Sequence, residues 1–322
     1  KKEIHVVLVN KINSMTTNQL NMIYKIKDSI HRETIQKHLT NLELTNHCKI
    51  IACMEVGSNA IGLGAPDSDY DFRFIYVREA PFYLQIKEKS KEEYELRLKI
   101  EPTKNVPELD FVGYDILKVL RLAKGSNPTI LDWINSSVIY YALHDQKLAQ
   151  PSPPLRCQLL KEDLENIKVF PIIQHLVREC VQMHGLMKNF YAVARGNAVS
   201  YLMIQRKENE RQALNCKKYI YVFHNLFRVL FIYHQLLKTG YDVDTKTLEL
   251  PPADFEEVMQ QVVSFTQPSS TTIPTILPPS SNVMLIIQKL VKKKKSRAGN
   301  WEGSPALLEL DTYIRYVLPL MK

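Results

Sequence analysis

The chain has 322 residues, which is enough to bury one large core or two smaller ones. Its 45% hydrophobic and 24% charged residues are ordinary values for a globular protein and do not favour a disordered one. The 42 Lys and Arg residues outnumber the 34 Asp and Glu residues, and the resulting charge of +8 favours phosphate-bearing partners. Part of this excess is one run, Lys292 to Lys295, and such runs are more often solvated helix ends than binding sites.

The cysteines and the apolar stretches indicate the cellular compartment of the protein. The five cysteines form no CxxC pair and have no metal-ligand spacing, which predicts a reducing, intracellular compartment, cytoplasmic or nuclear. The most apolar long stretch, Tyr219 to Leu237, contains two histidines and an arginine, so we expect a core helix and no membrane span. The sequence begins at Lys1 without a signal-peptide pattern, although a targeting segment before Lys1 would not be visible in it.

The first part of the chain mixes helix and strand patterns. Apolar residues recur at helical spacing from Asn18 to Leu39. Two short apolar runs, Cys48 to Val56 and Phe72 to Val77, predict buried strands. Strict alternation from Tyr94 to Ile100 predicts a half-exposed strand, and Leu109 to Val112 is expected to pair with it.

Helical patterns dominate the rest of the chain. One helix is predicted from Ile116 to a stop near Gly125, and Asn127 followed by Pro128 predicts the cap of another. From about Leu155 onward only helical periodicity is found. The helices expected there are Ile172–Tyr191, Asn215–Leu237, Ala253–Val263, Val283–Lys294 and Pro305–Met321.

This change of pattern predicts an α+β fold, with a mixed sheet and helices followed by an α-helical domain. We expect a first domain over residues 1–150 and a helical domain over residues 151–265. A Pro/Ser/Thr-rich stretch, residues 266–282, predicts a linker, and residues 283–322 predict the C-terminal helices.

The segment from Val56 to Val77 is the most informative about chemistry. Asp69 and Asp71 stand two residues apart at the start of a predicted strand, so their side chains point to the same face. Converging carboxylates suit two Mg²⁺ ions, which prefer oxygen ligands and leave positions for phosphate oxygens. In such a site one ion activates an attacking hydroxyl, and the other neutralises the leaving pyrophosphate.

Gly57 and Ser58 precede the carboxylates, at a strand end and before a short helix expected around Asn59 to Leu63. Glycine lets the backbone approach a triphosphate, the serine hydroxyl can donate to it, and a helix N-terminus supplies free amides. A Gly-Ser turn or an Asp-x-Asp pair alone is a weak signal, because most are solvated loops or strand ends. Their order between two apolar strands makes the combination far more specific.

A third carboxylate is needed from a neighbouring strand, and Asp110, between two apolar residues, fits that requirement. Asp115 is a competitor, but its position directly before a predicted helix favours an N-cap. Asp67 follows a proline and is expected in a turn.

Three basic residues are candidates for phosphate contacts. Arg73 lies on the same strand face as Asp69 and Asp71, where it can steady the carboxylates, contact a phosphate or form a structural salt bridge. Lys217 and Lys218 open the long helix of the second half and could reach a γ-phosphate across an interdomain cleft. Two exposed lysines at a helix end are nevertheless the commoner arrangement.

The chain resembles the RNA-repair-associated nucleotidyltransferases of the DNA polymerase β superfamily. The resemblance is specific in GSNAIGLGAPDSDYDFRFIYV and ELDFVGYDILKVLRLAKGSNPTILDWI, and looser in HGLMKNFYAVARGNAVSYL and KKYIYVFHNLFRVLFIY. It implies a polymerase β-type fold, Mg²⁺ dependence and transfer of a nucleoside monophosphate from an NTP, with Asp69, Asp71 and Asp110 as metal ligands. The chain departs from the family at Asn59, where arginine is usual, and at His224 and its successor, where Arg-Pro is usual.

The sequence therefore predicts an enzyme that transfers a nucleotide to a hydroxyl, with an RNA end as the expected acceptor. Two alternatives stay open: nucleotide transfer to a protein hydroxyl, as in antitoxin-like relatives in the superfamily, and a non-catalytic nucleotide-binding module. The three acids argue against the module, because clustered carboxylates without a cation repel one another. No pattern specifies the base preference, the acceptor or the oligomeric state.

Overall fold

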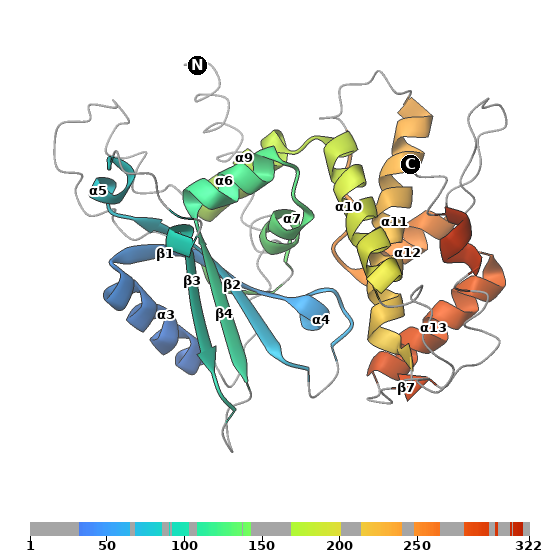
Figure 1. Ribbon diagram of the computed structural model, residues 1–322, viewed down its shortest axis with the longest axis horizontal. Helices are drawn as coiled ribbons and strands as arrows, with labels where there is room; N and C mark the ends of the chain where they lie inside the picture. Colours follow the sequence, from blue (N-terminus) through green and yellow to red (C-terminus); the bar gives the residue numbers. More distant parts are fainter. Residues whose placement is uncertain are drawn as a thin grey trace, which may run out of the picture. The chain divides into compact units, whose positions relative to one another are not determined.

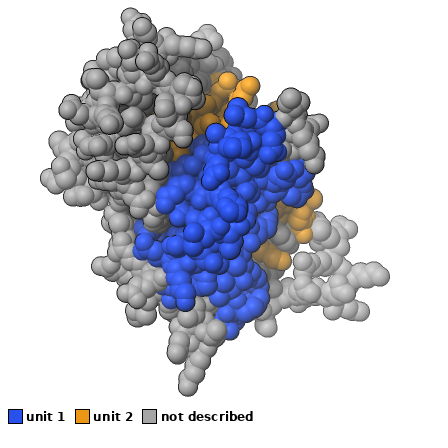
Figure 2. Space-filling view, turned by 90° about the vertical axis from the view of Figure 1, so that its left-hand side faces the viewer, with its two compact units in different colours: residues 1–56, 71–116, 136–172 blue, residues 57–70, 117–135, 173–322 orange. Residues whose placement is uncertain are grey.

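The computed structural model describes residues 32–64, 68–85, 90, 92–102, 108–136, 138–142, 169–200, 214–239, 248–264, 280–295, 300–301, 310 and 312–317. The chain divides into two compact units (Figure 2). Unit 1 is drawn from residues 1–56, 71–116 and 136–172, and unit 2 from residues 57–70, 117–135 and 173–322. The domain limits expected at residues 150, 265 and 282 stay predictions.

Unit 1 contains a five-stranded sheet in the order β3-β4-β2-β1-β5 (Figure 1). The strands are β1 Cys48–Val56, β2 Tyr70–Arg78, β3 Glu95–Ile100, β4 Leu109–Asp115 and β5 Ile139–Ala142. β1 pairs antiparallel with β2 and with β5, and β3 pairs antiparallel with β4. The predicted strands are confirmed, as is the α+β fold class. β5 adds to the prediction, because its four residues are too few to show a period.

One face of the sheet is apolar, and α3, Arg32–Asn46, packs along it (Figure 1). Phe72 of β2 stacks on Phe111 of β4 with ring centroids 4.6 Å apart, and it meets Tyr140 of β5 edge-on at 5.1 Å. His38 of α3 lies 6.1 Å from the Phe111 ring. These rings join three strands and a helix into one core.

The predicted first helix is confirmed over residues 32–39, and residues 18–31 lie outside the described residues. In the structure this helix continues to Asn46, because Leu42 adds one more buried position to the apolar stripe. Two short elements, α5 Ala80–Tyr83 and η1 Glu92–Tyr94, lie in unit 1 between β2 and β3.

Helices make up most of the described part of unit 2. They are α4 Gly57–Ala60, α6 Ile116–Lys124, α7 Pro128–Ile134, α9 Val169–Cys180, α10 Met183–Ala198, α11 Cys216–Thr239, α12 Phe255–Ser264 and α13 Ser281–Lys295, with the first residues of α6 and α9 in unit 1. The predicted cap of α7 is confirmed, since the Asn127 side chain accepts a hydrogen bond from the Thr129 amide at 2.9 Å.

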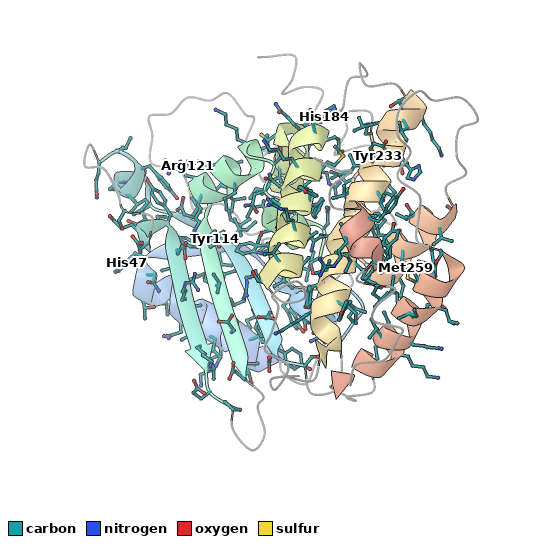
Figure 3. All side chains as sticks on the ribbon, turned by 45° about the vertical axis from the view of Figure 1, so that its right-hand side comes forward. His47, Tyr114, Arg121, His184, Tyr233 and Met259 are labelled. Carbon is teal, nitrogen blue, oxygen red and sulfur yellow. The ribbon has the colours of Figure 1, made fainter. Side chains whose placement is uncertain are left out.

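The long helix α11 is the buried helix that the sequence predicts. It packs against α10, α12 and α13, and Figure 3 labels Tyr233 on α11 and Met259 on α12, both buried. Its polar residues His224, Arg228 and His234 are buried too. In the described part of the chain, no helix combines the length and the apolar character needed to cross a bilayer.

Two predictions for the helical half are wrong in detail. The single helix expected from Ile172 to Tyr191 is two helices, because Gln182 has an extended backbone and its amide donates to the Ser126 hydroxyl at 2.9 Å. The region is not purely helical either. β6, Leu214–Asn215, pairs antiparallel with β7, Asn300–Trp301, and strands of two residues leave no periodic signal.

The remaining predictions for this half are tested only in part. Of the expected linker, residues 266–279 lie outside the described residues, whereas Ser281 and Asn282 begin α13. Of the helix expected from Pro305 to Met321, Leu310 and residues 312–317 are helical, and the other positions lie outside the described part.

Candidate active site

Asp71, Arg73 and Asp110 form one ion-paired cluster in unit 1. Arg73 Nη2 lies 3.3 Å from Asp71 Oδ1, and Arg73 Nη1 lies 3.2 Å from Asp110 Oδ2. The Arg73 guanidinium also donates to the backbone carbonyl oxygens of Phe72, at 2.8 Å, and Asp110, at 3.3 Å. One cation thus holds two carboxylates and two carbonyls from neighbouring strands.

Strand alternation and sheet order explain why these residues meet. Asp71 and Arg73 are two apart on β2, so both point away from the apolar face on which Phe72 lies. Asp110 precedes Phe111 on β4, the strand next to β2, and therefore points away from that face as well. Tyr114, labelled in Figure 3, lies on β4 at the same alternation as Asp110.

The cluster is accessible from solvent. The Asp71 and Asp110 side chains are 35% and 36% exposed, whereas Arg73 is 19% exposed. A cation or a phosphate-bearing molecule can therefore reach the carboxylate oxygens without unfolding the sheet. The more enclosed Arg73 is the fixed member of the group.

Lys99 belongs to the same polar face and was not singled out by its sequence pattern. It lies directly opposite Asp110 in the β3–β4 register, and its ammonium group pairs with Glu108 at 3.2 Å and with Glu101 at 3.6 Å. The alternation from residue 94 to 100 was the available signal, because it puts Arg97 and Lys99 on one face. Only the β3–β4 register, in which Lys99 lies opposite Asp110, shows that this face also carries Asp110.

Asp115, the competitor for the third carboxylate, is placed differently from Asp110. It is fully buried at the end of β4, and its Oδ2 accepts a hydrogen bond from the Tyr83 hydroxyl at 2.7 Å. Five residues separate it from Asp110 along the strand, so the two side chains point to opposite faces. Its predicted role as an N-cap stays a prediction.

Gly57 and Ser58 begin a compact turn in unit 2. Gly57 has φ 73°, a value that favours glycine, and α4 starts there, two residues before the predicted helix. The Leu63 amide donates to the Ser58 carbonyl at 2.8 Å, and the Ser58 hydroxyl lies 3.3 Å from the Ser68 hydroxyl. The turn is thus held by its own backbone, with the Ser58 side chain directed to the segment that leads into β2.

The other predicted site residues are placed as follows. Asp69, immediately before β2, is exposed and belongs to unit 2, and Asp67 lies outside the described residues. Lys217 and Lys218 lie in the first turn of α11, where Lys218 is half-buried and the Lys217 side chain lies outside the described part. Their proposed contacts with a nucleotide stay predictions.

No group of three or more His, Cys, Asp or Glu side chains in the described residues is arranged to hold a metal ion. Asp71 and Asp110 nevertheless fit a divalent cation chemically, since both present carboxylate oxygens to the same positive group. The predicted ligand set of Asp69, Asp71 and Asp110 stays a prediction.

The segment that contains this cluster is similar to a known protein family. Residues 31–150 match the RNA repair pathway DNA polymerase beta family. The match confirms the resemblance in the two specific motifs, which lie within it, and it includes the whole five-stranded sheet together with Asp71, Arg73 and Asp110. The family's name indicates a polymerase β-type nucleotidyltransferase of RNA repair.

A curated relative extends the similarity beyond this segment. The uncharacterized protein YcgL of Bacillus subtilis (strain 168) is 28% identical over 233 residues, which cover 72% of this chain and 70% of that protein. An alignment of that length must continue past the residues matched by the RNA repair pathway DNA polymerase beta family. Part of the helical half is therefore included in the similarity between the two proteins.

Proposed function

We propose that this protein is a Mg²⁺-dependent nucleotidyltransferase that moves a nucleoside monophosphate from an NTP to a hydroxyl acceptor, an RNA end. The observation that supports it most is the pairing of Asp71 and Asp110 around one cationic group on the solvent-accessible face of a sheet. The match to the RNA repair pathway DNA polymerase beta family supports the reaction class and RNA as the acceptor.

In this reaction the acceptor hydroxyl oxygen bonds to the α-phosphorus of the NTP. The bond between that phosphorus and the oxygen bridging to the β-phosphate breaks, pyrophosphate leaves, and the hydroxyl proton passes to solvent. Two bound Mg²⁺ ions would activate the hydroxyl and neutralise the leaving pyrophosphate. We assign Asp69, Asp71 and Asp110 to hold them, because hard cations require several carboxylate oxygens.

The remaining residues of the proposed site bind and orient the NTP. The Gly57-Ser58 turn offers its backbone and a serine hydroxyl to the triphosphate. Arg73 orients Asp71 and Asp110 through its ion pairs. Lys217 and Lys218 are proposed to bind the γ-phosphate.

The test is incorporation of label from α-phosphate-labelled NTPs in the presence of Mg²⁺, with RNA, DNA and protein offered as acceptors. Asp71→Asn and Asp110→Asn keep the side-chain volume but remove the charge, and each should lower incorporation by at least about 100-fold. Glu108→Gln is the matched control, since Glu108 is a nearby carboxylate that pairs with Lys99. Equal incorporation by the wild-type, Asp71→Asn and Asp110→Asn proteins would exclude the proposal.

The same assay separates the alternatives. Label on a protein band instead of RNA would indicate protein nucleotidylation. No label on any acceptor, in a protein whose melting temperature an NTP nevertheless raises, would indicate a non-catalytic nucleotide-binding module.

A further inference from the structure

The turn that follows Ser58 is joined to the first residues of α12. The Phe255 amide donates to the Ile61 carbonyl at 3.1 Å. Phe255 is the first residue of α12, so its amide is one of those without a partner inside the helix. The Asp254 carboxylate accepts from the Glu257 amide at 2.9 Å, as an N-cap does. The turn thus supplies one of the bonds that complete the start of α12.

Gly62 makes this contact close. Its φ of +75° lies in the region that L side chains rarely adopt, and a Cβ at this position would collide with the Asp254 carboxylate. A side chain here would be strained by its backbone and would push Asp254 away. The contact between the turn and α12 therefore depends on a glycine.

On its other side, the segment before α12 is held by α11. His224 Nε2 lies 3.0 Å from the Ala253 carbonyl oxygen, and because a carbonyl only accepts, Nε2 carries the proton and donates. Arg228, one turn later on α11, donates from Nε to the Pro252 carbonyl and from Nη2 to the Ala253 carbonyl, both at 3.4 Å. Two consecutive carbonyls are thus fixed by side chains of a buried helix.

Arg228 is itself fixed from two further directions. Its Nη1 lies 2.8 Å from Asp132 Oδ1 of α7, and its guanidinium carbon lies 4.9 Å from the centre of the Phe190 ring of α10. Only 2% of the Arg228 side chain is exposed. The Arg228 guanidinium, which holds Pro252 and Ala253, is therefore fixed by α7 and α10 as well as by its own helix α11, and it cannot easily change its position.

We propose that His224 and Arg228 are positioning residues for nucleotide binding. They hold the segment Pro252–Phe255, and this segment holds the turn Gly57–Leu63 through its bond to the turn's backbone. Neither residue contacts the nucleotide. The inference rests on the proposed function in assigning Ser58 to the triphosphate.

The experiment compares three substitutions on α11. His224→Leu removes the donor to Ala253, whereas His224→Gln keeps a side-chain N–H that can reach the same carbonyl. Gln235→Leu is the control, since Gln235 exchanges two 2.9 Å hydrogen bonds with the Glu249 backbone, on the same helix but outside the segment Pro252–Phe255. If His224→Leu does not fold, Arg228→Lys replaces it. This variant keeps a charge opposite Asp132 but lacks the Nε donor.

Two measurements are made on each folded protein. Calorimetric titration with NTP and Mg²⁺ gives the dissociation constant, and hydrogen exchange gives the opening of the Gly62 and Leu63 amides, which donate within the turn. His224→Leu should weaken NTP binding by about tenfold and speed exchange by a similar factor, as expected for one lost hydrogen bond. His224→Gln and Gln235→Leu should both stay within about twofold of wild type.

The two measurements separate the failure of this inference from the failure of the proposed function. Unchanged exchange in the turn of His224→Leu, or equal changes in His224→Leu and Gln235→Leu, would overturn the positioning role even if the wild-type protein binds NTP. Faster exchange in His224→Leu alone, in a protein whose wild type binds no NTP, would overturn the nucleotide assignment. In that case the role of His224 would be limited to fixing the turn.

Discussion

Arg73 lies between Asp71 of its own strand and Asp110 of the neighbouring strand, at 3.3 Å from the first carboxylate and 3.2 Å from the second. Its single positive charge attracts both carboxylates and offsets part of the repulsion between them. The proposed function places a divalent cation on the same oxygen atoms. Arg73 and the cation therefore share ligands, and each should weaken the attraction of the carboxylates for the other.

Arg73→Gln should bind Mn²⁺ several-fold more tightly than the wild-type protein, because a neighbouring positive charge is removed. The same change should lower the free energy of unfolding without metal by about 1–3 kcal/mol, since the two carboxylates lose a charged donor. Calorimetric titration with Mn²⁺ and urea unfolding measure the two effects. Lys49→Gln, which removes a partly exposed ion pair with Glu43 at the start of β1, is the control and should change neither appreciably. Mn²⁺ binding by Arg73→Gln that is unchanged or weaker would contradict the shared-ligand view.

Two glycines should respond to alanine in opposite directions. Gly113 on β4 faces the Phe74 ring, which occupies the space that a Cβ would need, so Gly113→Ala should destabilise the protein by about 1–3 kcal/mol. Gly196 in α10 has open space around it, and Gly196→Ala should stabilise the protein by about 0.5–1 kcal/mol through helix propensity. Urea unfolding of both variants measures this difference. A stability of Gly113→Ala equal to that of wild type would mean that Phe74 can move aside.

Most of the fold could be predicted because its signals are local. The apolar run from Cys48 to Val56 matches β1 at both ends, and Asn127 caps α7 as its position before a proline indicates. The break between α9 and α10 could not be predicted, because Gln182 is turned by Ser126, a residue distant in sequence. Local periodicity contains no information about such a contact.

The residues of the candidate site could be predicted from the sequence, but their contacts could not, because these depend on the order of the strands in the sheet. Alternation places Asp71 and Arg73 on one face, but their contact with Asp110 requires β2 and β4 to be neighbours. The support of the turn by His224 was beyond sequence reasoning for another reason. His224 bonds to the backbone carbonyl of Ala253, and because every residue has such a carbonyl, the sequence does not indicate which one is the partner.

The stability of the protein should fall as the pH is lowered below about 6.5. Burial, reinforced by the Arg228 charge, lowers the pKa of His224 well below its ordinary value, although the bond to Ala253 opposes this. The unfolded chain then binds a proton that the folded state does not bind, so stability is complete above the unfolded pKa and declines toward the folded one. His224→Gln should remove up to roughly 1 kcal/mol per pH unit of this slope.

Urea unfolding of wild type and His224→Gln between pH 7.5 and about 5 measures the contribution of His224. His38 and His234 also have lowered pKa values, mainly through burial, so the variant should retain part of the slope. If the free energies of unfolding of the two proteins change with pH in parallel, His224 binds its proton at the same pH in the folded and unfolded states. Burial would then not keep its ring neutral.

Tyr83→Phe should test whether Asp115 has a structural role only, in contrast to the proposed metal ligand Asp110. The Tyr83 hydroxyl donates to buried Asp115 at 2.7 Å and accepts from the Arg78 amide at 2.9 Å, so its removal takes a donor from one and an acceptor from the other. We expect a loss of about 2–3 kcal/mol in the free energy of unfolding. Asp115 points to the face opposite Asp110, so Mn²⁺ affinity measured well below the melting temperature should equal that of wild type. A fully folded Tyr83→Phe protein that binds Mn²⁺ as weakly as Asp110→Asn would instead make Asp115 a metal ligand, because a carboxylate buried on the apolar side has no other reason to affect cation binding.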